Sequence, residues 1–138
     1  AEFTQSGSLV FATLLSGVGT SNSAYGIALD TANNIYITGP TAGKFATPGA
    51  YNSTIAGLID AYVAKFNSTG SKVIYATYFG GTDSDYGQAI AGDRAVNAYI
   101  TGFTGSSGIA TPGAFNETIP PAPYSFCIFK NLVGCTTL

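Results

Sequence analysis

Short apolar runs, separated by turn residues, follow one another along most of the chain. In the run VIYATYF at residues 73–79, one face would carry Val, Tyr, Thr and Phe, and the other Ile, Ala and Tyr. An antiparallel strand with one face in water would instead alternate apolar with polar residues. These runs are rich in β-branched and aromatic residues and show no helical spacing of apolar positions. The pattern predicts an all-β protein whose sheets are covered on both faces.

The pattern occurs twice along the chain. The phrase ATPGAYNSTI at residues 46–55 returns as ATPGAFNETI at residues 110–119, and NNIYITGPT at residues 33–41 returns as VNAYITGFT at residues 96–104. The matches extend in both directions, with an offset that stays near 63 or 64 residues. A period of this length is typical of propeller blades and repeat arrays. The two halves of the chain are therefore copies of one unit.

Each unit contains four strand-like runs, of the types GIALD, NIYITG, DAYVAKFN and VIYATYFGG. The TPGA phrase lies between the second and third types, where Pro and Gly favour a turn. We predict a single domain, residues 1–138, with repeats at about 1–64 and 65–138. Each repeat would form a four-stranded antiparallel, propeller-like blade, because such sheets cover each other when they stack around an axis.

The two ends of the chain do not coincide with the boundaries of these four-strand units. A run of the fourth type, LVFATLLSG, stands near the N-terminus, and the last run of the third type, SFCIFKNL, has none after it. We therefore predict that the N-terminal strand completes the last blade, within the chain or from a neighbouring chain. This assembly strand comprises Leu9, Val10, Phe11, Ala12, Thr13, Leu14 and Leu15.

Essentially the entire chain is similar to a known repeat. The run DAYVAKFNSTGSKVIYATYFGGTDSDYGQAIAGDRAVNAYITGFT, closing with TPGAF, resembles the bacterial β-propeller repeat often labelled a seven-bladed propeller repeat. The first copy departs from it at SGVGTSNSAYG, and SFCIFKNL departs more. The resemblance implies a secreted or surface-exposed protein, usually with many tandem copies. It brings no established catalytic residues.

Two blades cannot close a propeller, which typically has four to eight. Head-to-tail pairing between copies would close as a ring of three or four chains or continue as an open filament. A fragment of a longer secreted propeller, or a compact two-blade sandwich, is the alternative. Bare apolar edges would aggregate, so a freely soluble monomer is the least favoured arrangement.

Composition narrows the possible functions. Only 9% of the residues are charged, the net charge is −2, and the chain has no His. Nucleic acid is excluded as a partner because no basic cluster is visible, and no apolar window is long enough for membrane insertion. The missing His removes the usual general base and the commonest metal ligand. We expect a non-enzymatic, extracellular or cell-surface protein without a cofactor.

The acidic loop GGTDSDYG suggests weak calcium candidates, Asp83 and Asp85. Calcium needs six to eight oxygen ligands, and the matching loop of the first copy has no carboxylate. A polar turn with Asp caps is the alternative. For surface glycans, the candidate aromatic platforms are Tyr25, Tyr51 and Phe115, which could equally pack between blades.

Two cysteines near the C-terminus, Cys127 and Cys135, are predicted to form a disulfide across a terminal hairpin. The alternative is a pair of small buried side chains in a reduced protein. Three N-x-[ST] sequons make Asn52, Asn67 and Asn116 glycosylation candidates, although chance matches are common in such a composition.

Together these features predict an extracellular structural or interaction module that self-assembles through head-to-tail strand pairing. The alternative function is a glycan-binding lectin of oligomeric propeller type. A hydrolase is disfavoured, because Ser nucleophiles have no His partner and no GxSxG elbow is present.

Overall fold

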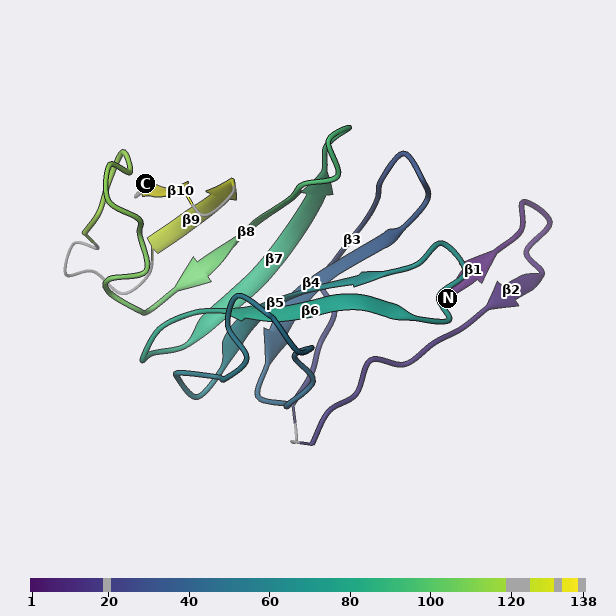
Figure 1. Ribbon diagram of the computed structural model, residues 1–138, viewed down its shortest axis with the longest axis horizontal. Coiled ribbons are helices and arrows are strands. Elements are labelled where there is room, and N and C mark those ends of the chain that lie inside the picture. The colour runs from purple at the N-terminus through teal and green to yellow at the C-terminus, as the bar shows by residue number, and fades with distance from the viewer. Residues whose placement is uncertain (19–20, 119–124, 131–132, 137–138) are drawn as a thin grey trace.

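The computed structural model describes residues 1–18, 21–118, 125–130 and 133–136, with side chains described as far as residue 118 (Figure 1). This part of the chain forms strands and turns and no helix, which confirms the predicted all-β class. Consequently, no helix within these ranges could cross a membrane.

All strand pairs in the described ranges are antiparallel, and they form three sheets. The N-terminal hairpin consists of β1 (Glu2–Phe3) and β2 (Leu9–Phe11). The first sheet has the order β3 (Gly26–Leu29), β4 (Ile35–Thr41), β5 (Asp60–Phe66), β6 (Val73–Phe79). The second sheet has the order β7 (Asp85–Gly92), β8 (Ala98–Thr104), β9 (Ser125–Lys130), β10 (Val133–Thr136).

The first sheet has two faces, which we call A and B. Tyr36 and Thr38 lie on face A, and Ile37 lies on face B, because successive side chains of a strand point to opposite sides. Ile27 pairs with Ile37 in the register of β3 and β4, so it also lies on face B. Every residue of β5 is buried, and this strand contributes to a separate apolar core on each face.

Face A of the first sheet is covered by the second sheet. Ile90 of β7 and Ile100 of β8 pack against buried residues of β5 and β6. Figure 1 shows β7 running beside β3 and β4. Ile90 pairs with Ile100 just as Ile27 pairs with Ile37, so these two residues define face B of the second sheet. The contact therefore joins face A of one sheet to face B of the next.

The N-terminal hairpin repeats the geometry of β5 and β6. The register pairs are Glu2 with Phe11 and Phe3 with Leu9 in the hairpin, and Lys65 with Tyr75 and Phe66 with Val73 in the first sheet. A register shift falls at the same place in both. The turn glycines Gly7 and Gly70 have left-handed φ values of 82° and 65°, which a glycine adopts without strain. The repeat therefore begins before the first sheet.

The N-terminal strand does not complete the second sheet within the chain. It is regular only over Leu9–Phe11, where it pairs with β1. The place beside β9 is taken by β10, the second strand of the predicted terminal hairpin, and not by the N-terminal strand. Strand completion in the chain is thus not confirmed, and donation between chains stays a prediction.

The two cysteines are directly opposite each other in the backbone register of β9 and β10. This agrees with the predicted terminal hairpin. The side chains of Cys127 and Cys135 lie outside the described residues, so their disulfide stays a prediction.

Candidate interaction site

A tight turn before β4 is organised around the Asp30 carboxylate. One oxygen of this carboxylate accepts hydrogen bonds from the backbone N–H groups of Ala32 and Asn34, both at 2.9 Å. The other oxygen accepts one from the Asn34 side chain at 2.9 Å. Asn33, inside the turn, has a left-handed φ of 60°, which Asn tolerates better than most residues. The Asp side chain therefore holds the turn closed.

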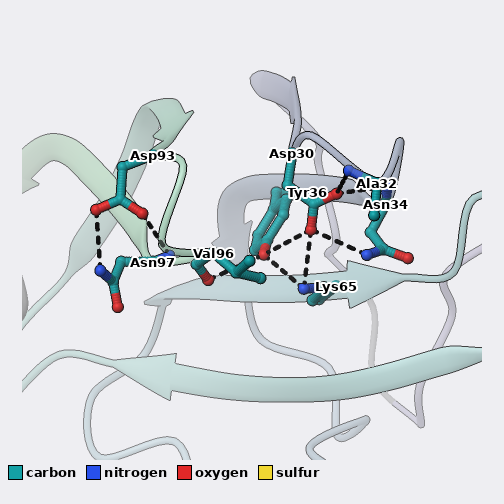
Figure 2. Close-up of polar contacts among 8 residues, drawn as sticks. All are labelled: Asp30, Ala32, Asn34, Tyr36, Lys65, Asp93, Val96 and Asn97. Atoms are coloured by element: carbon teal, nitrogen blue, oxygen red, sulfur yellow. Dashed lines mark hydrogen bonds and ion pairs between the residues drawn. The ribbon is translucent and has the colours of Figure 1, made fainter.

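This turn is tied to the second sheet through Lys65 and Tyr36 (Figure 2). The Lys65 ammonium lies 3.0 Å from the Asp30 carboxylate and donates a 2.6 Å hydrogen bond to the Tyr36 hydroxyl. That hydroxyl lies 3.1 Å from the backbone carbonyl of Val96, in the turn between β7 and β8, and donates to it. All three side chains of the first sheet are buried. A buried polar chain thus crosses the contact between the sheets.

The ionised forms of Asp30 and Lys65 stabilise each other. Burial by itself would raise the pKa of Asp30, but hydrogen bonds from Asn34 and Lys65 outweigh it and hold the pKa well below its usual value. Burial would lower the pKa of Lys65, and the bonds to Tyr36 and Asp30 raise it instead. Both groups are therefore charged at neutral pH.

The second sheet carries the same arrangement at its own turn. The Asp93 carboxylate accepts hydrogen bonds from the backbone and side chain of Asn97, at 2.8 and 2.9 Å, and from the Tyr99 hydroxyl at 2.7 Å. The side-chain bonds from Asn97 and Tyr99 lower the pKa of Asp93 to about 2. Tyr99 is half-buried, whereas its counterpart Tyr36 is fully buried. The difference arises because, among the described residues, no sheet packs on face A of the second sheet as the second sheet packs on face A of the first.

Face B of the first sheet carries an open apolar groove of about 1090 Å³. Its floor includes β3 and the residue before it, and Tyr25, Ile27 and Leu29 are 54%, 66% and 57% exposed. The N-terminal hairpin borders it through Glu2 and Phe11. The large exposed side chains of β3 make this groove the candidate interaction site.

The predicted glycan platforms do not converge on this groove. Tyr25 lines it, but Tyr51 and Phe115 belong to the two copies of the TPGA loop and are absent from the lining in the described part of the chain. Both loop aromatics are largely exposed, at 70% and 91%. A shared platform of three rings is therefore not formed within one chain.

The acidic loop is used internally. Asp85 is buried and accepts hydrogen bonds from Thr104, from the Ser106 hydroxyl at 2.7 Å and from the Gly81 backbone at 2.8 Å. Asp83 caps the backbone N–H of its neighbour Ser84 at 2.9 Å. Within the described residues no group of three or more acidic or Cys side chains could hold a metal ion. These contacts fit the alternative of a polar turn with Asp caps.

A second buried carboxylate lies near Asp85. Asp60 accepts hydrogen bonds from the backbone N–H groups of Ala56 and Gly57, at 3.1 and 3.3 Å. Burial is the main cause that raises the pKa of Asp60, and the charge of Asp85 adds to it. Gly80, which connects the two sheets, fits between the two carboxyl groups only because it has no side chain.

The three sequon asparagines all lie in hydrogen-bonded turns. Asn52 and Asn116 each accept a bond from the backbone of the Thr two residues on, both at 3.1 Å. The Asn67 amide donates to Thr69 and Ser71, both at 3.0 Å. The turns are at the surface, and glycosylation of these residues stays a prediction.

The assembly strand is partly exposed. Leu9, Val10 and Leu14 are 58%, 53% and 91% exposed, whereas Leu15 packs against the core on face B. An added Cβ at Gly70 would clash with the Phe11 ring, so this ring lies directly on the turn between β5 and β6. The hairpin thus rests on the end of the first sheet.

The sequence pattern did not predict the roles of Ile27 and Leu29 or the link from Lys65 to Tyr36. For the polar link, the repeat itself is a signal, since Asp30, Asn34 and Tyr36 recur 63 residues later. A shared pattern of three polar residues at matched places marks a structural role. The exposure of Ile27 had no such signal, because it depends on which neighbour covers the strand.

A comparison with known families identifies the first of these repeats. Residues 10–46, which run from β2 past the end of β4, match the family model described as a beta-propeller repeat. The resemblance seen in the sequence is thereby confirmed over this segment. No curated protein matches the chain.

Proposed function

We propose that this protein is an extracellular, non-enzymatic structural or interaction module that self-associates head to tail. In this proposal its two four-stranded sheets act as propeller-like blades. A beta-propeller repeat match supports a structural or interaction role. The single observation that carries self-association is the contact between unlike faces of the two sheets.

A contact between unlike faces leaves one complementary surface unpaired at each end of the chain. After the two sheets have packed, the β3 side of face B stays open on the first sheet, whose β5 and β6 are covered there by Leu15 and Phe45, and face A stays open on the described part of the second sheet. A contact of this heterologous kind repeats until a ring closes, or continues as a filament. The apolar residues of β3 are exposed, as is expected when no sheet packs against them on face B.

The other parts of the proposal rest on composition and on the use of polar groups. A charged fraction of 9% is low against roughly 25% in typical soluble domains. The buried carboxylates are occupied by structural hydrogen bonds, and every buried polar side-chain atom of the described residues has a partner. Both features support a scaffold without a catalytic centre.

Solution mass tests self-association. Sedimentation velocity over a hundredfold range of concentration should show species heavier than the 14.0 kDa monomer, and negative-stain images should show rings or filaments. A single 14.0 kDa species at every concentration contradicts the proposal.

A lectin is the second candidate, favoured by the position of Tyr25. This exposed ring lines the groove together with Asn22 and Asn33, and an aromatic face in a groove that also carries polar residues suits a sugar. A glycan array should then give a signal that Tyr25→Ala abolishes and Tyr51→Ala leaves intact. An array without signal rejects this candidate.

A further inference from the structure

We infer that the groove on face B of the first sheet binds face A of the second sheet from another copy of this chain. The inference rests on the proposed head-to-tail association and identifies the surface that performs it. The template is the contact between the two sheets of one chain, because the repeat places equivalent residues on the free faces.

The groove side of the new contact is equivalent to a surface that is already packed. Ile27 and Ile37 occupy the same register positions in the first sheet as Ile90 and Ile100 in the second. Ile90 and Ile100 pack against face A of the first sheet. Ile27 has the same side chain at the same position, yet it is 66% exposed. Face A of another sheet would partly bury it, as face A of the first sheet partly buries Ile90.

The opposite side of the contact is also present and uncovered. Tyr99 and Thr101 on face A of the second sheet match Tyr36 and Thr38, which are fully buried under the second sheet. Tyr99 and Thr101 are only half-buried. Each chain thus carries one free half of the contact at each end.

Close backbone approach extends the match to β7. Gly26 lies so near the second sheet that an added Cβ would be 3.0 Å from the Cα of Ala89. Ala89 occupies the equivalent of Gly26 in the register of the second sheet, and its side chain is exposed on face A. In the docked pair this side chain would lie against the backbone of β3 in the next copy, at a distance tighter than ordinary contact, so one of the two strands must shift by a few tenths of an ångström.

A polar contact would set the register of the two copies. Within the chain, the Tyr36 hydroxyl donates to the carbonyl of Val96, which has a φ of 69°. The equivalent of Val96 in the first turn is Asn33, which has a φ of 60° and lines the groove. The Tyr99 hydroxyl, which donates to the Asp93 carboxylate within its own chain, would therefore turn its proton to the Asn33 carbonyl of the next copy.

Two variants separate the two halves of the contact. Ile27→Glu places a charge in the groove, and Ala89→Glu places one on face A of the second sheet. Both replaced side chains are exposed, so each variant should fold, which circular dichroism checks; Leu29→Glu serves as a second groove variant. Leu58→Glu, at a residue that is 83% exposed in the loop before β5, is the matched control.

The expected results follow from head-to-tail geometry. Each of the two variants should weaken association at least tenfold, since burial of an isoleucine side chain would be lost. The Leu58→Glu control should associate as the wild type does. An equimolar mixture of Ile27→Glu and Ala89→Glu should form one-to-one dimers and nothing larger, because each retains the half that the other has lost.

Other results overturn the inference in distinguishable ways. A monomeric wild type contradicts self-association itself, and the groove inference falls with it. A wild type that associates, with Ile27→Glu and Leu29→Glu unaffected, leaves the proposed function standing and rejects this surface. A mixture that forms no dimer, although both single variants lose association, rejects the pairing of the groove with face A.

Discussion

At the scale of single residues, the two sheets are joined by a buried polar chain rather than by apolar contact alone. Lys65, Asp30 and Tyr36 come from three places in the first sheet, and the chain ends on the carbonyl of Val96 in the second. Such a chain is directional, because it aligns one hydroxyl with one carbonyl. Apolar side chains alone would allow the sheets to slide.

The Tyr36 hydroxyl should therefore matter for stability. Tyr36→Phe removes the donor to Val96 and the acceptor for Lys65, and it should lower the free energy of unfolding by about 1–2 kcal/mol. Urea unfolding measures the change. Tyr51→Phe, at an exposed ring, should stay within about 0.5 kcal/mol of the wild type. Equal effects of the two variants would contradict a role for the buried hydroxyl.

The carboxylate of the second turn should make stability depend on pH in acid. The folded-state pKa of Asp93 is lowered from 3.8 to about 2, so its contribution is present above pH 3.8 and is lost as the pH falls through about 2. Urea midpoints measured between these pH values should fall, and they should fall less steeply for Asp93→Asn. Identical slopes in the two proteins would exclude Asp93 as the source.

At the scale of elements, the connection between the sheets depends on a glycine. Gly80 directly follows β6 and begins the connection to β7, and an added Cβ would lie 2.6 Å from the Asp85 carboxylate and 2.7 Å from the Asp60 carboxyl carbon. Both aspartates are buried and held by hydrogen bonds. Moving either carboxylate away from an added Cβ would therefore break hydrogen bonds and cost free energy.

Gly80→Ala should destabilise the protein by about 1–3 kcal/mol through this overlap. Gly92→Ala is the matched control, because an added Cβ there meets nothing closer than 3.6 Å. Thermal unfolding should show a lower midpoint for the first variant and little change for the second. A tolerated Gly80→Ala would show that the carboxylates can separate.

The terminal hairpin offers a second prediction at this scale. Because Cys127 and Cys135 are opposite each other in the register, the purified protein should contain no titratable thiol under oxidising conditions. Reduction should cost about 2.5 kcal/mol on the chain-entropy estimate for so short a loop. Two thiols titrated in the unreduced, denatured protein would support the alternative of buried, reduced side chains.

At the scale of the whole molecule, the proposed contact is apolar with one neutral hydrogen bond. Association should therefore vary less than about threefold when salt is raised from roughly 0.05 to 0.5 M, since screening acts on charges. Sedimentation equilibrium at the two ionic strengths measures this. A steep salt dependence would indicate that charged groups carry the contact.

Local features of the fold were accessible from the sequence. The runs GIALD, NIYITG, DAYVAKFN and VIYATYFGG each coincide with a strand from β3 to β6, because enrichment in β-branched and aromatic residues and the bounding turn residues act over a few positions. The spacing of the two cysteines predicted a terminal hairpin, but it did not predict that the second strand of this hairpin, β10, would fill the fourth position of the second sheet. Its run VGCT is brief, and its pairing with β9 is decided by which edge is free.

The sequence by itself determined the class of the fold, its repeat and the polar residues that recur in each turn. Only the tertiary structure decided which neighbour each strand and each face has. Ile27 and Ile90 show the physical reason: they are the same residue at the same register position, and they differ in exposure because a sheet covers only one of them. Burial is a property of neighbours in space, and in a repeat every copy offers the same local pattern to whichever neighbour is present.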